Sequence, residues 1–379
     1  MTEASFLCKF IRDNPDSWQR RLESEYSIKC KRDGALAIFN YGYECDFRDP
    51  LVQEARGIII DTERLSVVCF PFRKFGNHNE YYADEIDWDT ARVQEKVDGS
   101  IIKLWYNEYR GAWQFSTNGM IDADFAEIDG LIGRRFGDII READNYGDIP
   151  FGELERDSTY IFELVSPDTR VIVDYGRTTL YHIGTRNNLT GVEYDADIGI
   201  KKPATFPLHS LPECIEAARI LNARAGNEVS AEGYVVVDAK YRRVKVKSPD
   251  YLMQHRLRLS PDVSKRTCIE LVLGGREDFD TAVRLNPVLA PALKYYDFKL
   301  TEMIAETRQL TELAKKLLKE YSGDRGAMAR IIAKHPLSAF AFRSLDRGLD
   351  AEDIVRSIQI DRMIQLIPTY EPRDLSGLF

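Results

Sequence analysis

The stretch EGYVVVDAKYRRVKVKS, residues 232–248, decides the fold class of this chain. It contains two runs of β-branched and aromatic residues, 233–238 and 242–247, and such runs predict strands. The short polar turn DAKY joins them, and strands joined by so short a turn pair in antiparallel fashion. The stretch therefore predicts an antiparallel sheet.

The second of these strands carries basic side chains on one face. Successive side chains of a strand point to opposite faces, so Arg243, Lys245 and Lys247 share one face, and Val244 and Val246 share the other. If the valines point to the core, the cations line either a groove or open solvent. Both interpretations stay open, because a charged strand face is most often simply solvated.

Similar strand-like runs recur through the first 250 residues, at 35–41, 56–61, 65–72, 100–106, 159–165 and 179–185. Helical periodicity interrupts them at 122–144 and 211–224. We expect an α+β domain over residues 1–253, with helices packed on antiparallel sheets.

Helical periodicity dominates from about residue 254 onward. We expect helices at 295–321, 324–335 and 350–367, the last with Asp350 as its N-cap. Four leucines of the first helix recur at helical spacing: Leu310, Leu313, Leu317 and Leu318. Residues 254–379 are therefore predicted to form an all-helical domain.

Composition describes a globular protein. Of 379 residues, 44% are hydrophobic and 30% are charged, and no apolar run approaches the roughly 18 residues of a membrane span. The first residues lack the basic-then-apolar order of a signal peptide, so we expect a cytoplasmic protein. The six cysteines form no CxxC pair, which disfavours a zinc site. A net charge of −9 disfavours a nucleic-acid-coating protein but leaves a local cationic groove possible in principle.

Lys96 stands before an Asp-Gly pair in QEKVDGSIIKLW, residues 94–105. One interpretation is a solvated lysine at a strand end followed by a hairpin turn. The other is a nucleophile, held on rigid backbone among other cations. These twelve residues alone favour the first, because Lys-x-Asp-Gly occurs by chance in many proteins.

Other charged residues lie in strand-like runs. Glu163 has apolar neighbours, so its charge is costly unless it is paired in a salt bridge or bound to a ligand. Glu232 opens the strand opposite the paired lysines. Arg56 on a strand and Lys74 in a loop each have the simple interpretation of a solvated residue. Taken together, these cations and carboxylates are what binding a triphosphate with a divalent ion requires.

The order of KVDGS, FELVSP, EGYVVV and VKVKS resembles the nucleotidyltransferase motifs of covalent polynucleotide ligases and capping enzymes. More closely, the chain resembles the phage T4-type RNA ligase 1 family. The segments IFNY, EARGIII, PFRKFGNHNE, ELVSPDTRVIVDY and EGYVVVDAKYRRVKVKS have counterparts there in the same order, as do the length and the helical tail.

The resemblance implies an ATP-dependent RNA ligase that joins 3′-hydroxyl and 5′-phosphate ends in the repair of broken tRNA or single-stranded RNA. Lys96 would attack the α-phosphate of ATP to form lysyl-AMP, the adenylate would pass to an RNA 5′-phosphate, and a 3′-hydroxyl would displace AMP. The helical domain would give specificity for RNA. We expect a monomer, which would act in the host cytoplasm if it is phage-encoded.

Further roles are implied residue by residue. The matches to ATP-contacting positions are Tyr41, Arg56, Lys74, Glu163, Lys245 and Lys247. Glu232 matches a carboxylate that serves the metal, Mg²⁺ or Mn²⁺, and the chemistry. A lysine with a pKa of about 10.4 needs it lowered to about 7–8 to act as a nucleophile. Positive charge from Lys245, Lys247 and the metal would lower the pKa of Lys96. The carboxylates of Glu163 and Glu232 would raise it unless a ligand occupies them.

The chain departs from the family pattern at two positions. Asn118, in FSTNGM, stands where the family has a basic residue, and Gly274, in ELVLGGRED, stands where it has an aspartate linked to metal binding. Asp278 is a conjectural substitute, and the metal site of the helical domain stays unassigned.

Three alternatives are weighed. A capping guanylyltransferase or a DNA ligase should carry an OB-fold barrel after the last lysine motif, where this sequence predicts helices. A non-catalytic RNA-binding module would be expected to lack a motif residue, yet Lys96, Glu163, Glu232, Lys245 and Lys247 are all present. The physiological RNA is not identified, since Lys315, Lys316 and Lys319 of the helical tail are equally typical of a solvated face.

Overall fold

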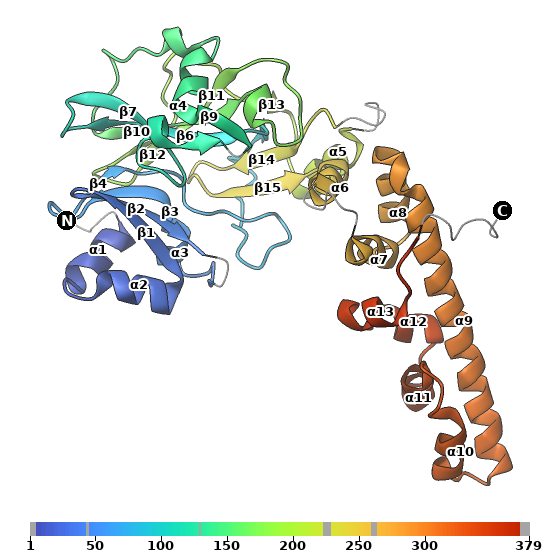
Figure 1. Ribbon diagram of the computed structural model, residues 1–379. Coiled ribbons are helices and arrows are strands. Elements are labelled where there is room, and N and C mark those ends of the chain that lie inside the picture. Colours follow the sequence, from blue (N-terminus) through green and yellow to red (C-terminus); the bar gives the residue numbers. More distant parts are fainter. Residues whose placement is uncertain (1–4, 43–44, 129, 223–228, 259–263, 372–379) are drawn as a thin grey trace. The chain divides into compact units, whose positions relative to one another are not determined.

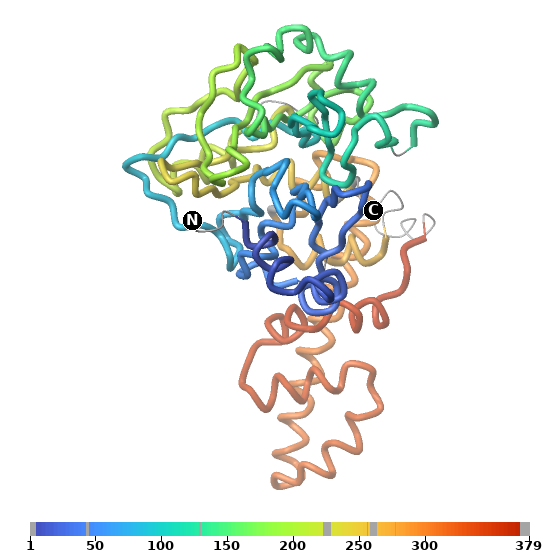
Figure 2. Tube along the Cα trace, turned by 90° about the vertical axis from the view of Figure 1, so that its left-hand side faces the viewer, coloured from blue at the N-terminus to red at the C-terminus, as the bar shows by residue number. Residues whose placement is uncertain are grey.

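A computed structural model describes residues 5–42, 45–128, 130–222, 229–258 and 264–371. The chain divides into two compact units, one ending at Tyr251 and the other beginning at Leu252 (Figure 1). The first unit contains the antiparallel sheets and the second is helical; in Figure 2 they run from blue to yellow and from orange to red. The predicted α+β fold is confirmed.

The first sheet of the amino-terminal unit has the order β1-β2-β3-β4, all antiparallel. Its strands are β1 (Ile28–Asp33), β2 (Leu36–Tyr41), β3 (Arg56–Asp61) and β4 (Ser66–Cys69). Three helices accompany it, α1 (Phe6–Asp13), α2 (Trp18–Tyr26) and α3 (Pro50–Glu54). Leu7 and Leu22 of the helices pack with Phe39, Ile58 and Ile60 of the sheet, which forms the core of this layer.

The second sheet has the order β12-β11-β10-β6-β7. Its strands are β6 (Ser100–Asn107), β7 (Ala112–Thr117), β10 (Ser158–Val165), β11 (Thr179–Asn187) and β12 (Glu193–Tyr194). Helix α4 (Phe136–Glu142) packs on it through Ile139 and Ile140, and Trp105 on the sheet packs against Ile38 and Ile59 of the first sheet.

The third sheet, β13-β5-β14-β15, contains the hairpin predicted from residues 232–248. Its strands are β5 (Arg92–Glu95), β13 (Thr205–Phe206), β14 (Gly233–Val237) and β15 (Arg243–Lys247). Val244 and Val246 are buried with Cys214 and Ala218 of α5 (Leu211–Ile220), as the alternation of β15 predicts. Helix α6 (Pro249–Arg258) follows.

The helical prediction for residues 122–144 is wrong over most of its length. Only α4 is an α-helix there; a short 3₁₀ turn (Ala123–Phe125) and the strands β8 (Glu127–Ile128) and β9 (Leu131–Arg135) precede it. Gly130 and Gly133 have φ angles of +82° and +76°, which an α-helix does not accommodate. The predicted strand at 65–72 likewise ends at Cys69, shortly before Pro71, because proline cannot donate to the ladder.

The described residues of the carboxyl-terminal unit form helices joined by short loops, and they contain no strand. Its helices are α7 (Lys265–Leu273), α8 (Arg276–Leu285), α9 (Ala290–Glu320), α10 (Arg325–Ile332), α11 (Ser338–Arg347), α12 (Ala351–Arg356) and α13 (Ile360–Leu366). Short 3₁₀ turns occupy Tyr146–Asp148 and Pro167–Thr169 in the first unit and Pro287–Leu289 in the second. None of the helices in the described part of the chain is both long and apolar enough to cross a membrane.

The helix predictions for this unit are confirmed with changes. The Asp350 side chain accepts a hydrogen bond from the Glu352 N–H at 2.9 Å, so it caps α12 as expected, but residues 350–367 form two helices. Leu310, Leu317 and Leu318 pack with Met328 and Ile332 of α10. Leu313, the fourth leucine at helical spacing, is instead 42% exposed.

Candidate active site

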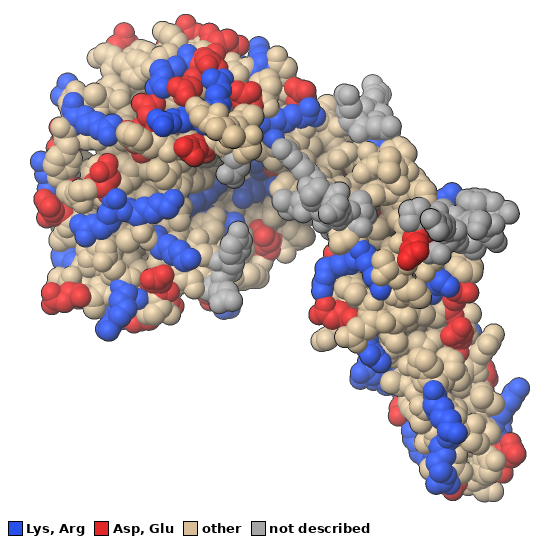
Figure 3. Space-filling model, in the orientation of Figure 1, with Lys and Arg blue, Asp and Glu red and all other residues tan. Residues whose placement is uncertain are grey.

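A pocket in the amino-terminal unit lies between the second and third sheets. Apolar side chains and charged side chains share its wall: Phe72, Phe75, Ile101, Ile183, Val235 and Pro203 with Arg56, Glu95, Lys96, Glu163, Arg243, Lys245 and Lys247. Basic side chains gather in a hollow of this unit in the space-filling view (Figure 3). The groove interpretation of the basic face of β15 is therefore confirmed, and its cations are not simply solvated.

Lys96 lies where the chain passes from one sheet to the other. Strand β5, before it, belongs to the third sheet and β6, after it, to the second, so Asp98 and Gly99 form no hairpin turn. The Lys96 N–H donates to the Gly233 carbonyl at 2.9 Å, which continues the β5–β14 pairing beyond Glu95. The side chain of Lys96 is thereby fixed beside the start of β14.

Glu232 joins two of the lysines. Its Oε2 atom lies 2.7 Å from Lys96 Nζ and its Oε1 atom 2.8 Å from Lys247 Nζ, and the residue is only 2% exposed. Burial lowers the pKa of Lys96, but the Glu232 and Glu163 carboxylates outweigh it and the net pKa is raised. The lowered pKa expected of a nucleophile is thus not found while Glu232 is paired to the amine.

Glu163 on β10 is buried beneath the same pocket. One of its oxygens accepts the Gly99 N–H at 3.2 Å, and no described cation lies within ion-pairing distance. Burial, with the Glu232 charge, raises the pKa of Glu163 to about 7, against the opposing effect of Lys96 and Arg56. The salt-bridge interpretation therefore does not hold among the described residues.

The side chains of Arg56, from the first sheet, and Lys245, from the third sheet, both lie near the ring of Phe75. The Arg56 guanidinium lies 5.5 Å and Lys245 Nζ 4.6 Å from the centroid of Phe75. Burial and the charges of neighbouring cations, Arg56 first among them, lower the pKa of Lys245 to about 6. Neither side chain has a described carboxylate within ion-pairing distance, so both are available to an anion.

Tyr41 and Lys74 adjoin this pocket without lining it. Tyr41 lies beside Arg56, and Lys74 Nζ lies 5.3 Å from the centroid of the Tyr41 ring. The loop that carries Lys74 pairs with β15, because the Lys245 N–H donates to the Gly76 carbonyl at 3.0 Å. The structure therefore brings the eight predicted residues together. Five of them line the pocket, Arg56, Lys96, Glu163, Lys245 and Lys247, and Glu232 is paired with two of these lysines. Tyr41 and Lys74 lie next to the pocket.

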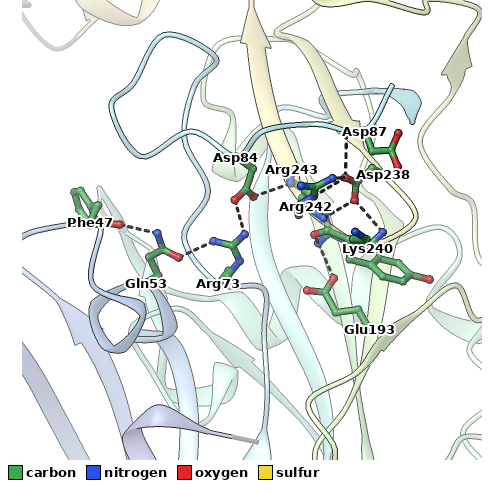
Figure 4. Close-up of polar contacts among 11 residues, drawn as sticks. Phe47, Gln53, Arg73, Asp84, Asp87, Glu193, Asp238, Lys240, Arg242 and Arg243 are labelled. Carbon is green, nitrogen blue, oxygen red and sulfur yellow. Dashed lines mark hydrogen bonds and ion pairs between the residues drawn. The ribbon is translucent and has the colours of Figure 1, made fainter. Parts of the chain in front are cut away.

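Arg243 has a different environment from the lysines of its strand face. Its Nη1 atom pairs with Glu193 Oε2 at 2.6 Å, and its backbone N–H donates to Asp84 at 2.9 Å (Figure 4). Asp238, in the turn after β14, holds Arg242 by a second ion pair at 2.7 Å. The ion pairs of Arg242 and Arg243 fix the hairpin. Unlike Lys245, Arg243 is therefore already paired with a carboxylate.

Asp98 is a functional candidate that the sequence reasoning missed. Its Oδ2 atom accepts from the N–H groups of Ile172 and Val173, both at 2.8 Å, and its Oδ1 atom accepts from the Tyr251 hydroxyl at 2.7 Å. Tyr251 in turn lies under Lys247, 5.0 Å from ring centroid to Nζ. The segment with Lys96 is thus tied down two residues beyond the lysine. Its partners are remote in sequence, so no local signal could have revealed them.

Lys103 was also missed. It is 0% exposed, and its Nζ donates to the carbonyls of Thr117 at 2.6 Å and Gly57 at 3.2 Å and to Asn118 Oδ1 at 3.4 Å. Burial lowers its pKa to about 8. A cation therefore lies next to Asn118, where the family has a basic residue. The sequence did contain a signal for Lys103, because it is a charged residue within the apolar run SIIKLW. A charged residue with apolar neighbours was also the reason for selecting Glu163.

The carboxyl-terminal unit offers no comparable site within its described part. Across all described residues, no group of three or more His, Cys, Asp or Glu side chains is arranged to hold a metal. Gly274 ends α7, and a Cβ atom there would lie 2.3 Å from an Asp278 oxygen. Asp278 as a substitute metal ligand stays a prediction.

A model of the T4 RNA ligase 1 type, described as RNA ligase, matches residues 54–251. The chain belongs to this RNA ligase family. The match covers every residue discussed at the pocket of the amino-terminal unit except Tyr41, and it confirms the resemblance drawn from the motifs.

Two relatives illustrate the range of the RNA ligase family. An RNA ligase of Rhodothermus phage RM378 is 27% identical over 374 residues, with 82% of each chain covered. A protein of Autographa californica nuclear polyhedrosis virus, named as a candidate bifunctional polynucleotide kinase/RNA ligase, is 28% identical over 299 residues, or 73% of this chain. The match spans only 41% of that viral protein. Among solved structures, an archaeal ATP-dependent RNA ligase is 13% identical with a TM-score of 0.46, covering 79% of this chain and 82% of that one.

Proposed function

We propose that this chain is an ATP-dependent RNA ligase that joins RNA 3′-hydroxyl and 5′-phosphate ends through lysyl-AMP and RNA-adenylate intermediates. The observation that carries the proposal is the position of Lys96, at the wall of a pocket whose basic side chains Arg56 and Lys245 have no described carboxylate partner. A nucleophile next to basic groups that can pair with phosphate oxygens is what transfer of a nucleotidyl group requires.

The first step needs a neutral amine. Lys96 Nζ attacks the α-phosphorus of ATP, an N–P bond forms, and the P–O bond to pyrophosphate breaks. Arg56, Lys245 and Lys247 would neutralise the phosphate oxygens as negative charge moves to the leaving group. The Lys96 proton must leave first, and it passes to solvent once Glu232 no longer pairs with the amine.

The carboxylates suit a divalent cation bound together with nucleotide. Glu163 and Glu232 are hard oxygen donors, and Mg²⁺ is typically held by one or two carboxylates with substrate phosphates. Glu232 would hold Mg²⁺ or Mn²⁺, which when bound supplies positive charge to the phosphates, and Glu163 would contact ATP. Glu232 would then leave Lys96, which removes the contact that raises the pKa of the amine.

Tyr41 and Lys74 are proposed to contact ATP from the neighbouring strand and loop. The two units are proposed to be a nucleotidyltransferase domain, residues 1–253, and an RNA-specificity domain, residues 254–379. RNA with single-stranded or broken tRNA ends is the proposed substrate, with the protein acting as a monomer in the cytoplasm. Family membership and the chemistry of the pocket support this substrate class.

Labelling with ATP tests the proposal. The wild-type protein, incubated with [α-³²P]ATP and Mg²⁺, should form an acid-stable, hydroxylamine-labile protein–AMP adduct, and Lys96→Ala should not. Lys29→Ala, which removes an exposed lysine from β1, is the matched control and should label as wild type. Absence of the adduct, or an adduct in Lys96→Ala, would reject the mechanism. Labelling by GTP in place of ATP would indicate a capping enzyme, and ligation of nicked tRNA, single-stranded RNA and nicked duplex would rank the substrates.

A further inference from the structure

A row of aromatic rings leads away from the pocket. The ring centroids of Tyr41 and Phe47 are 5.0 Å apart, those of Phe47 and Tyr82 are 5.1 Å apart, and those of Tyr82 and Tyr81 are also 5.1 Å apart. Tyr41 lies beside Arg56 of the pocket, whereas Tyr81 at the other end is 66% exposed. We call Phe47, Tyr81 and Tyr82 the aromatic shelf.

Two cations accompany the aromatic shelf. Lys74 Nζ lies 4.9 Å from the Phe47 centroid and 6.0 Å from that of Tyr82, and no described carboxylate lies within ion-pairing distance of it. The Arg48 guanidinium lies 5.6 Å from the Tyr81 centroid. Arg48 also pairs with Asp46 at 2.8 Å, but its side chain is 71% exposed and this surface pair is weak.

Part-buried polar contacts hold Phe47 of the shelf in place (Figure 4). The Phe47 carbonyl accepts from the Gln53 amide at 2.6 Å, whose oxygen accepts from Arg73 at 2.6 Å. Arg73 pairs with Asp84 at 2.5 Å, and Asp84 accepts the backbone N–H of Arg243 on β15 at 2.9 Å. The chain of contacts therefore fixes the shelf to the strand that carries Lys245 and Lys247.

A backbone hydrogen bond also orients the Tyr81 ring. Its hydroxyl accepts the Phe47 N–H at 3.3 Å, so the ring is held although two-thirds of the residue is exposed. The exposed part of the ring is apolar surface, and ordering a side chain with so few rotatable bonds against a ligand costs little conformational entropy.

Aromatic faces interspersed with cations suit unpaired nucleotides. Bases stack on exposed rings whatever their sequence, while phosphates are neutralised by the neighbouring cations. We propose that the aromatic shelf binds unpaired nucleotides of the RNA strand whose end enters the pocket, with a base stacked on Tyr81 and phosphates at Lys74 and Arg48. This inference rests on the proposed function, because it takes RNA as the substrate.

The test is fluorescence anisotropy with a 5′-fluorescein-labelled 12-nucleotide oligouridine. Tyr81→Ala should bind this RNA about 5- to 100-fold more weakly than wild type, the range expected for one lost stacking contact. Tyr81→Trp keeps a large ring, so it should bind the RNA about as tightly as wild type and more tightly than Tyr81→Ala by the same factor. A blunt RNA duplex, whose bases are already stacked, should show little difference between wild type and Tyr81→Ala.

Phe125→Ala is the matched control. Phe125 is 60% exposed with Arg135 at 6.0 Å from its ring, yet it lies in the 3₁₀ turn before β8, and its loss should not weaken RNA binding. Unchanged oligouridine binding in Tyr81→Ala, or an equal loss in Phe125→Ala or with duplex, would overturn the proposal. ATP labelling of wild-type Lys96 is measured separately, so failure of the ligase proposal appears there as an absent adduct.

Discussion

The Nζ atom of Lys96 lies 2.7 Å from Oε2 of Glu232, which is buried, whereas the Lys96 side chain is 18% exposed. Glu232 also pairs with Lys247, so one carboxylate compensates two ammonium groups. Removing a charge from water is costly unless an opposite charge accompanies it, and here the pairing keeps the Lys96 amine protonated. The contact that stabilises the lysine is therefore the one that must be lost before it reacts.

Glu232→Gln should lower the pKa of Lys96, because it removes the carboxylate that raises it. Lys96 should therefore react with an amine reagent at lower pH than in the wild-type protein. The measurement is the pH dependence of Lys96 modification by trinitrobenzenesulfonate, read by peptide mass spectrometry. Glu95→Gln, which neutralises another glutamate of the pocket, is the control. The same midpoint in Glu232→Gln and wild type would contradict the assignment.

Gly99→Ala should destabilise the protein and displace the Lys96 segment. A Cβ atom at position 99 would lie 2.3 Å from the Leu164 carbonyl oxygen and 3.1 Å from Glu163 Cγ, and β10 is a central strand that does not yield easily. We expect a loss of about 1 to 3 kcal/mol in the free energy of unfolding, measured with urea, and slower labelling by ATP. Gly147→Ala, at an open position, should change neither, and equal stability of the two variants would show that the contact relaxes without cost.

Gly99 also shows where sequence reasoning reached its limit. The turn interpretation treated this glycine as a source of backbone freedom, and its φ is not among the positive values of the chain. Its function is close approach to β10, a strand some 60 residues further along, and no local pattern reports such a neighbour. The same holds for Asp98, whose partners lie 74 to 153 residues away.

Local periodicity succeeded where the neighbours were local. The alternation in β15 predicted which face is buried, because the side-chain period of a strand is fixed by backbone geometry. It failed at residues 122–144, where Gly130 and Gly133 break the helical pattern with positive φ angles. The gathering of the ATP-contact candidates came from the order of the family motifs, since spacing alone could not bring β3, β10 and β15 together.

Asp98→Ala should be among the more destabilising single substitutions near the pocket. It removes the hydrogen-bond acceptor of the buried Val173 N–H, of the part-buried Ile172 N–H and of the Tyr251 hydroxyl, and each such loss costs about 1 kcal/mol or more. Tyr251→Phe removes only one of the three bonds and should cost about 1 kcal/mol. Urea unfolding of both variants and of the double variant forms a cycle. If Tyr251→Phe costs as much in the Asp98→Ala background as in wild type, the two side chains are not coupled.

His182 should make the stability of the protein depend on pH. Its ring is buried on β11 against Tyr160 and Phe162, with Nε2 at 2.9 Å from Thr185 Oγ1 and Nδ1 without a described partner. Burial, with a smaller effect of Lys202, lowers the pKa of His182 to about 4. The folded protein therefore excludes a proton that the unfolded chain accepts near pH 6.5.

The sign follows from this difference. Above about pH 6.5 the imidazole is neutral in both states, and the contribution of His182 to stability is fully present. As the pH falls towards 4, the unfolded state gains a proton that the folded state does not, and about 3 kcal/mol is lost. The free energy of urea unfolding should decline less steeply between pH 6.5 and 4 in His182→Gln than in wild type. His209→Gln, which replaces an exposed histidine, should keep the wild-type slope, and identical slopes in all three proteins would mean that His182 takes up its proton in the folded state.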